Sequence, residues 1–407
     1  MRIVHTSDWH AGRTWKGLSR IDELEAALSG LAAFLAKEEV DLLLVTGDVF
    51  DHAAPSPEAE RVVFQFLKRV GQLGVESVVI AGNHDHAGRM EAWGALTSLA
   101  GVRTVARPLR PDEGGVLEVV SRVGEHAVVA ALPFASVGDL LRANEVAGGE
   151  TEARQRYADQ LRRAIARLSA KFRADAINIF MAHTHFEGAV LARSERAVHC
   201  TEQWTALPEA LAPNAHYTAL GHIHRPQSIS AAPPARYAGS PMQLDFGEMG
   251  DEKSFVFIEA SPRVPVAIRL VPYEGTRQLM ELRLDVDSLR ACEEAGGDPE
   301  RVRAATGVDP DALDAAWLRV VVALLAPDPD VASRVRKLFP RAVEVRVDLP
   351  TLDPEIVAAP GPSLSPREAY ADYVVARRKR DPDAALLDAF DALRAECSRG
   401  EGGEVEP

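Results

Sequence analysis

Five short polar segments, each following a short apolar run, constrain the fold of this chain more than any other feature of its sequence. Their side chains are carboxylates, an amide and imidazoles, which are groups that bind metal ions. In chain order the segments are Ser7-Asp8-Trp9-His10, Thr46-Gly47-Asp48, Gly82-Asn83-His84-Asp85, His183-Thr184-His185 and Gly221-His222-Ile223-His224. Open α/β sheets place their sites where the strands end. The sequence therefore predicts a sheet whose edge gathers these side chains.

The spacing within the first two segments suits metal binding. Asp8 and His10 are two residues apart, so at the end of a strand they point to the same side and can hold one ion. Gly47 lets the backbone turn sharply and present Asp48, whose two carboxylate oxygens can bridge two cations. Taken alone, Asp48 is better explained as a cap on the next turn, so its role as a ligand depends on the other segments.

The third segment adds a different chemistry. Asn83 offers a neutral oxygen ligand, and His84 beside it is placed for acid–base catalysis. A mixture of carboxylate, amide and imidazole suits manganese, iron or zinc better than a cage of oxygens alone would. Two such ions about 3.5–4 Å apart can neutralise a phosphoryl group as charge develops on it. The five segments together predict a phosphoesterase with two metals.

The apolar pattern predicts alternating strands and helices in the first half of the chain. The expected strands are 3–6, 42–46, 78–81, 116–121, 127–132, 176–181 and 216–220. Helices are expected at 20–38, at 151–171, and from Ser56-Pro57-Glu58, where a cap residue precedes a first-turn proline. A β-α-β-α start followed by closely spaced strands predicts a layered α/β sandwich with a second sheet.

The pattern changes near residue 271, which predicts several domains. We expect a phosphoesterase domain over 1–270, a small α+β domain over 271–349 and a Pro-rich linker over 350–366. Strands are expected at 280–286, 318–325 and 342–347. Two helices then occupy 367–398, and 399–407 is expected to be disordered.

Bulk composition sets limits on function and location. The chain has 46 basic and 60 acidic residues, giving a net charge of −14 that repels nucleic acids at long range. Three widely spaced cysteines indicate neither a disulfide framework nor a cysteine-based zinc site. No signal peptide and no apolar run of membrane-spanning length is recognisable, so a cytoplasmic location is expected.

The polar segments resemble the signature of the calcineurin-like metallophosphoesterases. More narrowly, the chain is similar to the SbcD family, the nuclease subunits of bacterial SbcCD complexes for double-strand-break repair. The narrower likeness rests on Gly47-Asp48-Val49-Phe50-Asp51, on Ala219–Arg225, and on Tyr237-Ala238-Gly239-Ser240-Pro241 followed by Leu244-Asp245-Phe246. It implies an α/β/β/α sandwich with a small capping domain and C-terminal helices.

The resemblance also implies the site and its two divalent metals, in this family Mn²⁺. One metal would be held by Asp8, His10, Asp48 and His224, and the second by Asp48, Asn83, His183 and His222. His84 would stabilise or protonate the leaving oxygen, with Asp85 orienting it. His185 competes with His183, which we prefer because it is nearer the strand end. Asp51 stands where some relatives have a histidine, which leaves a role for His52 doubtful.

The implied activity is manganese-dependent hydrolysis of DNA, as an exonuclease from 3′ ends of duplexes and an endonuclease on single strands or hairpins. The implied partners are DNA, an SbcC-like SMC-type ATPase that the C-terminal helices contact, and a second copy of the chain. On that helical segment, Ala385, Leu386, Phe390 and Leu393 share one face. The alternatives are a small-molecule phosphodiesterase or phosphatase on the same centre, and a scaffold without catalysis. A scaffold should lack a ligand or His84, and none is missing here.

Several other residues have two interpretations. Trp9 and Asp85 could serve only in packing or in turns. Arg225 could meet a DNA phosphate or form a surface ion pair. The remaining histidines are expected to have structural or solvent-facing roles; they are His5, His86, His126, His199 and His216.

Overall fold

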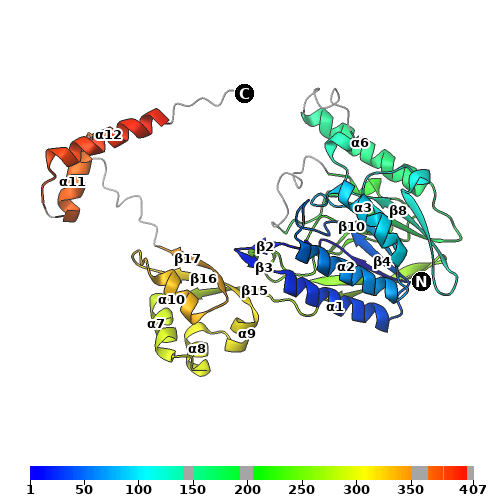
Figure 1. Ribbon diagram of the computed structural model, residues 1–407, viewed down its shortest axis with the longest axis horizontal. Coiled ribbons are helices and arrows are strands. Elements are labelled where there is room, and N and C mark those ends of the chain that lie inside the picture. The colour runs from blue at the N-terminus through cyan, green and yellow to red at the C-terminus, as the bar shows by residue number, and fades with distance from the viewer. Residues whose placement is uncertain (141–149, 193–204, 350–364, 379, 401–407) are drawn as a thin grey trace. The chain divides into compact units, whose positions relative to one another are not determined.

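A computed structural model describes residues 1–140, 150–192, 205–349, 365–378 and 380–400. Residues Met1–Asp348 form one compact unit, and Leu349–Pro407 form a second (Figure 1). Within the described residues, no helix combines the length and the apolar character needed to cross a bilayer.

Six strands form the first sheet, and four of them are parallel neighbours. The order is β14 (Val264–Pro272), β13 (Ser254–Ser261), β1 (Arg2–Thr6), β4 (Leu42–Thr46), β5 (Glu76–Ile80) and β6 (Val102–Val105). The strands β1, β4, β5 and β6 run parallel, whereas β13 pairs antiparallel with β1, and β14 pairs antiparallel with β13.

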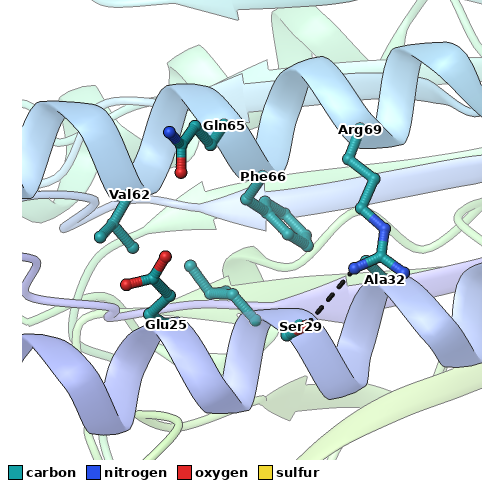
Figure 2. A pocket seen from close by; sticks show the side chains of 8 residues that line it. Glu25, Ser29, Ala32, Val62, Gln65, Phe66 and Arg69 are labelled. Atoms are coloured by element: carbon teal, nitrogen blue, oxygen red, sulfur yellow. Dashed lines mark hydrogen bonds between the residues drawn. The ribbon is translucent and has the colours of Figure 1, made fainter.

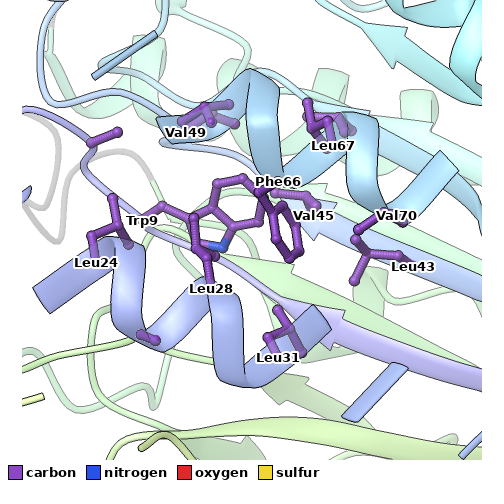
Figure 3. Packing of buried hydrophobic residues seen from close by; sticks show 14 of the residues in the cluster. Trp9, Leu24, Leu28, Leu31, Leu43, Val45, Val49, Phe66, Leu67 and Val70 are labelled. Atoms are coloured by element: carbon purple, nitrogen blue, oxygen red, sulfur yellow. The ribbon is translucent and has the colours of Figure 1, made fainter. Parts of the chain in front are cut away.

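Three helices contribute to the outer face of this sheet: α1 (Ile21–Lys37), α2 (Pro57–Gln72) and α3 (Ala87–Thr97). The Ser56 side chain caps α2 by accepting a hydrogen bond from the Ala59 N–H, and Pro57 needs no partner for its missing N–H. Trp9 is fully buried in this layer and meets the Phe66 ring edge-on at 5.3 Å (Figure 3). Trp9 therefore anchors the loop after β1 to the core, with Asp8 and His10 on either side of it.

The second sheet also has six strands, with parallel strands at its centre. The order is β11 (Gln227–Ile229), β12 (Ala235–Tyr237), β10 (Tyr217–Gly221), β9 (Ile177–His183), β8 (His126–Leu132) and β7 (Val116–Val120). β12, β10, β9 and β8 are parallel, and β11 and β7 pair antiparallel with their neighbours. Helix α6 (Glu150–Ser169) covers the sheet with Tyr157, Leu161 and Ile165, which join its outer core.

The two sheets face each other across a shared apolar core. Ile3, Leu44 and Val78 come from the first sheet, and they pack with Ile179, Met181 and Tyr217 from the second. The buried His5 ring links the sheets, because its Nδ1 lies 2.9 Å from the Tyr217 hydroxyl. The result is the expected α/β/β/α sandwich, in which helices cover both outer faces.

A smaller three-stranded sheet follows in the chain. Its strands are β15 (Leu279–Leu284), β16 (Trp317–Ala323) and β17 (Ala342–Asp348), all parallel. The helices between them are α7 (Val286–Ala295), α8 (Pro299–Thr306), α9 (Pro310–Ala315) and α10 (Val331–Leu338). We call residues 279–348 the small module. Its Trp317 donates from the indole N–H to Glu23 of α1 at 2.8 Å.

The second unit contains two helices that pack on each other, α11 (Pro366–Arg378) and α12 (Ala384–Gly400). The Tyr370 and Phe390 rings stack in parallel at 4.2 Å, and Arg367 pairs with Asp388 and Asp391. The helix α12 continues to Gly400, two residues into the segment expected to be disordered. Residues 401–407 and most of the expected linker lie outside the described residues.

Candidate metal centre

Each segment singled out in the sequence follows a parallel strand, and the strands come from both sheets. Asp8 and His10 follow β1, Asp48 follows β4, and Asn83 follows β5. His183 ends β9, and His222 and His224 follow β10. Since the two sheets face each other, the carboxyl ends of these five strands present their side chains to one place.

A first group of side chains consists of Asp8, His10, Asp48 and His224. One ligand atom from each lies within 4.8 Å of the others, and all four residues are buried. The Nε2 atoms of His10 and His224 are 3.0 Å apart. The His10 Nε2 also lies 3.6 Å from the Asp48 Oδ2. These are the four residues expected to hold one metal.

A second group adjoins the first and shares Asp48 with it. The Asn83 amide oxygen lies 2.9 Å from His183 Nε2 and 2.8 Å from His222 Nδ1. His183 Nε2 is in turn 3.6 Å from the same Asp48 Oδ2. The Asp48 carboxylate therefore borders both groups, which is the position required of a bridging ligand.

The electrostatics of these groups fit two divalent cations. Burial raises the pKa of Asp48 well above its usual value, and the nearby charges of Asp8 and Asp85 raise it further. Burial lowers the pKa of His183 to about 3 and that of His10 well below its usual value, so both rings are neutral. A metal ion binds the free lone pair of a neutral imidazole, and its positive charge stabilises carboxylates that are crowded together in their ionised form.

Three of the histidines expected to bind metal have their other ring nitrogen next to a fixed acceptor. His10 Nδ1 lies 3.1 Å from Asp51 Oδ1, His183 Nδ1 donates to the Thr46 carbonyl at 2.7 Å, and His224 Nδ1 lies 3.4 Å from Glu248 Oε1. Such acceptors fix the orientation of the ring and strengthen its lone pair toward a metal. The sequence reasoning assigned no such role to Asp51 or Glu248. Asp51 could have been noticed because it lies three residues after Asp48, whereas Glu248 follows Leu244-Asp245-Phe246, a motif that indicated the family and not the metal centre.

His84 and Asp85 have different surroundings. The His84 Nδ1–H donates to the Asp51 carbonyl at 2.8 Å, which leaves Nε2 directed toward Asp48 at 3.9 Å. Asp85 accepts from the backbone N–H groups of Gly82, Val49 and Phe50 at 2.8, 3.2 and 3.0 Å. Asp85 thus ties the loops after β4 and β5 together, and it is the Asp51 carbonyl, in these contacts, that orients His84.

The backbone around the ligands is strained. The backbone φ values of Asp8, His10, Asp48 and His222 are 51°, 46°, 48° and 98°. Residues other than glycine rarely adopt positive φ values. Close packing also requires glycine at several of these turns. A Cβ on Gly82 would lie 2.1 Å from Asp48 Oδ1, and one on Gly221 would lie 1.9 Å from the Thr46 carbonyl oxygen. Strain of this kind concentrates where geometry serves a function.

The structure separates the remaining candidates. His183, rather than His185, contacts Asn83 and Asp48 in the second group. His52 is 64% exposed and pairs with Asp51 at 3.2 Å on the outer side. Arg225 forms an ion pair with Asp251 at 3.2 Å.

Three other histidines have structural partners or caps. His5 is buried between the sheets, His86 caps α3, and His216 accepts from the Asn178 N–H. His199 lies outside the described residues. A groove between α1 and α2, with Glu25, Ser29 and Arg69 in its wall, contains none of the expected ligands (Figure 2).

Comparison with known proteins agrees with this geometry. The calcineurin-like phosphoesterase family matches residues 1–226. The SbcD component of the nuclease SbcCD from Bacillus subtilis is 37% identical over 267 residues, which cover 64% of this chain and 67% of the relative. The SbcD proteins from Rhodobacter capsulatus and Escherichia coli K12 are 34% and 30% identical. They cover 71% and 72% of this chain, and 76% and 73% of their own lengths. The chain therefore belongs to the calcineurin-like phosphoesterase family and, within it, to the SbcD family of nuclease components.

Proposed function

We propose that this protein is a manganese-dependent DNA nuclease, acting from the 3′ ends of duplexes and on single strands or hairpins. The observation that carries the proposal is the pair of ligand groups that share Asp48, with His84 beside them. Relatives named as nuclease components match most of the chain and supply the substrate class. Ligands of mixed oxygen and nitrogen type support Mn²⁺, and Zn²⁺ or Fe²⁺ would also suit them.

Two bound divalent ions would neutralise the phosphoryl oxygens and lower the pKa of the attacking water. The chain's own residues would do the rest. Asp8, His10, Asp48 and His224 would hold one ion, and Asp48, Asn83, His183 and His222 the other. The His84 Nδ1–H is held by the Asp51 carbonyl, so a second proton can reside only on Nε2, on the side of the ligands. From there His84 can donate a proton to the leaving 3′ oxygen.

We propose that the second unit binds an SbcC-like ATPase of the SMC type. The relatives are named as one component of a complex, SbcCD. In this unit Tyr373 is 57% exposed and Leu393 is 63% exposed, on two helices that pack on each other. Exposed apolar side chains on a helix pair suit insertion into a groove of another protein. The proposed division is 1–270 for the nuclease domain, 271–349 for a capping domain and 367–398 for the partner-binding helices.

We also propose that two copies of the chain pair within a heterotetramer. Leu96, near the end of α3, is 71% exposed and lines an apolar pocket with Phe64, Leu67 and Trp93. Leu99 is 88% exposed in the 3-10 helix η1 (Ser98–Ala100) that follows α3. A second copy with the same surface would bury it in a symmetric contact. Pairing would take place in the cytoplasm, on the bacterial nucleoid.

The decisive test is digestion of a 5′-labelled linear duplex with Mn²⁺ by the purified full-length protein and by His84→Gln. We expect stepwise shortening from the 3′ end, and a rate about 10²- to 10⁴-fold lower for the variant, the range for loss of a general acid. Mn²⁺ binding by the variant should be unchanged. A cyclic dinucleotide assayed in parallel tests the small-molecule alternative. Intact DNA together with rapid turnover of that compound would replace the nuclease proposal.

A further inference from the structure

The residue His224 is enclosed by the segment 239–253, which follows it in the sequence. The Ser240 N–H and the Lys253 ammonium donate to the His224 carbonyl at 3.1 and 2.8 Å. From the same segment, Glu248 Oε1 lies 3.4 Å from His224 Nδ1. Both the backbone and the ring of this expected ligand therefore depend on the conformation of residues 239–253.

Glu248 is itself held firmly. It is fully buried, and its Oε2 lies 2.5 Å from the Lys253 ammonium. The same oxygen accepts from the Leu244 N–H at 3.2 Å and from the Ser240 hydroxyl at 3.4 Å. Burial alone would raise the pKa of Glu248, but the charge of Lys253 and the contact with His224 hold it below its usual range. Glu248 is thus a fixed anion behind the His224 ring.

The small module contacts this segment at Phe246, two residues before Glu248. Phe246 begins the short 3-10 helix η5 (Phe246–Glu248), and the Arg319 guanidinium of β16 lies 4.0 Å from the centre of its ring. Phe246 also shares a small apolar cluster with Trp15 and with Leu279 of β15. A 3-10 turn with Phe246 at one end and Glu248 at the other connects the small module to the carboxylate.

Two further contacts fix this connection. The Leu279 N–H at the start of β15 donates to the Gln243 amide oxygen at 2.7 Å, and the Gln243 amide nitrogen donates to Gln278 at 2.8 Å. Arg319 is 14% exposed and lies between Glu281 and Glu344 of the neighbouring strands, at 3.4 and 3.2 Å. The guanidinium is therefore placed by all three strands of the small module.

We propose that Glu248 is a positioning residue for His224, and that the small module sets its position through Arg319 and Phe246. The packing of the small module on η5 would thereby tune the affinity of the first ligand group for its metal. Because the second group contains neither His224 nor any residue of segment 239–253, its affinity would not change. The inference rests on the metal centre of the proposed function and does not depend on DNA being the substrate.

The test is a titration of the full-length protein with Mn²⁺. Binding is measured by calorimetry and, independently, by the electron paramagnetic resonance signal of free Mn²⁺. Glu248→Gln should weaken one of two binding events about 10- to 100-fold, the range for partners of metal ligands. Phe246→Leu and Arg319→Met, which keep Glu248 and its ion pair, should weaken the same event about tenfold. Asn83→Ala, which removes an expected ligand of the second group, identifies which event belongs to which group.

Arg334→Met is the matched control, because it removes an arginine of the same module whose ion pairs with Glu293 and Asp328 lie on its helical side. Its Mn²⁺ affinities should equal those of the wild type. Thermal unfolding without metal shows that each variant is folded. The proposal is overturned if Phe246→Leu and Arg319→Met bind Mn²⁺ as the wild type does, or if both binding events weaken equally. Neither result would bear on DNA cleavage, which the digestion experiment measures separately.

Discussion

At the scale of single residues, three glycines let the loops of this site lie very close together. Gly47, Gly82 and Gly221 all lie where a Cβ would fall between 1.9 and 2.3 Å from an atom of another ligand segment. The loops after β4, β5 and β10 can therefore meet only because these positions lack a side chain. Asp48 and His222, which follow Gly47 and Gly221, have positive φ values that the surrounding packing must enforce.

We expect Gly221→Ala to lower both the stability of the protein and its Mn²⁺ affinity, although the substitution adds only one methyl group. The added Cβ would lie 1.9 Å from the Thr46 carbonyl oxygen, so either β10 or the loop after β4 must shift. The free energy of unfolding should fall by about 1 to 3 kcal/mol, and Mn²⁺ binding should weaken. Gly30→Ala in α1 is the control, because its Cβ would meet nothing within 4 Å. Denaturant unfolding and Mn²⁺ titration of both variants measure the difference; equal effects would contradict the argument.

His5 should make the stability of the fold depend on pH. Burial lowers its pKa to about 3, with a smaller contribution from the charge of Arg236. Its ordinary value near 6.5 applies in the unfolded chain. The unfolded chain thus binds the proton first, so stability is fully present above about pH 6.5 and is lost as the pH falls toward 3. His5→Gln should remove about 2 kcal/mol of the loss between pH 6.5 and 5. Parallel stability curves for the two proteins would refute this role.

At the scale of elements, most strands were predictable from their apolar runs, including all five that precede expected ligands and β7 and β8, which only complete a sheet. The apolar runs before Asp8, Asp48, Asn83, His183 and His222 correspond to β1, β4, β5, β9 and β10 within two residues at each end. β13 and β14 were missed, because β13 pairs with β1 from more than 250 residues away and no local pattern marks that pairing. Glu248 was missed for the same physical reason, since a glutamate in a polar loop resembles a surface residue until its distant partners are known.

The end of α3 and the following η1 should mediate pairing of two copies. Leu99→Glu places a charge in the proposed contact, where desolvation is costly, and should convert a dimer into a monomer. Leu325→Glu is the control, because Leu325 is 89% exposed, as Leu99 is at 88%, but belongs to the small module. Light scattering after gel filtration gives the mass of each protein. An unchanged dimer with Leu99→Glu would exclude this surface as the contact.

At the scale of the whole molecule, a chain of net charge −14 must bind a polyanion. Long-range repulsion opposes that encounter, so the attraction has to come from bound cations, local basic groups and the partner. This overall charge was evident from the sequence, as was the convergence of five segments on one place. How the small module contacts the loop behind His224 was not, because it depends on packing between segments far apart in the chain.

Removal of metal should therefore weaken both stability and DNA binding. Chelation should lower the unfolding temperature, since an ion present at 100 times its dissociation constant contributes about 2.7 kcal/mol to the folded state. Binding of a labelled duplex by the apo protein should be weak and should weaken further with salt. Calorimetric scans and fluorescence anisotropy measure the two effects. Tight duplex binding by the apo protein that is insensitive to salt would show that the charge argument is wrong.

The distribution of the ligands over two sheets has a consequence for how the protein is made. The first ligands, Asp8 to Asn83, leave the ribosome long before His183, His222 and His224 are synthesised. A nascent chain that ends before residue 222 lacks His222 and His224, even if its first sheet has already folded. A chain still being translated therefore lacks part of the expected ligand set until His224 has been synthesised and both sheets of the sandwich have met.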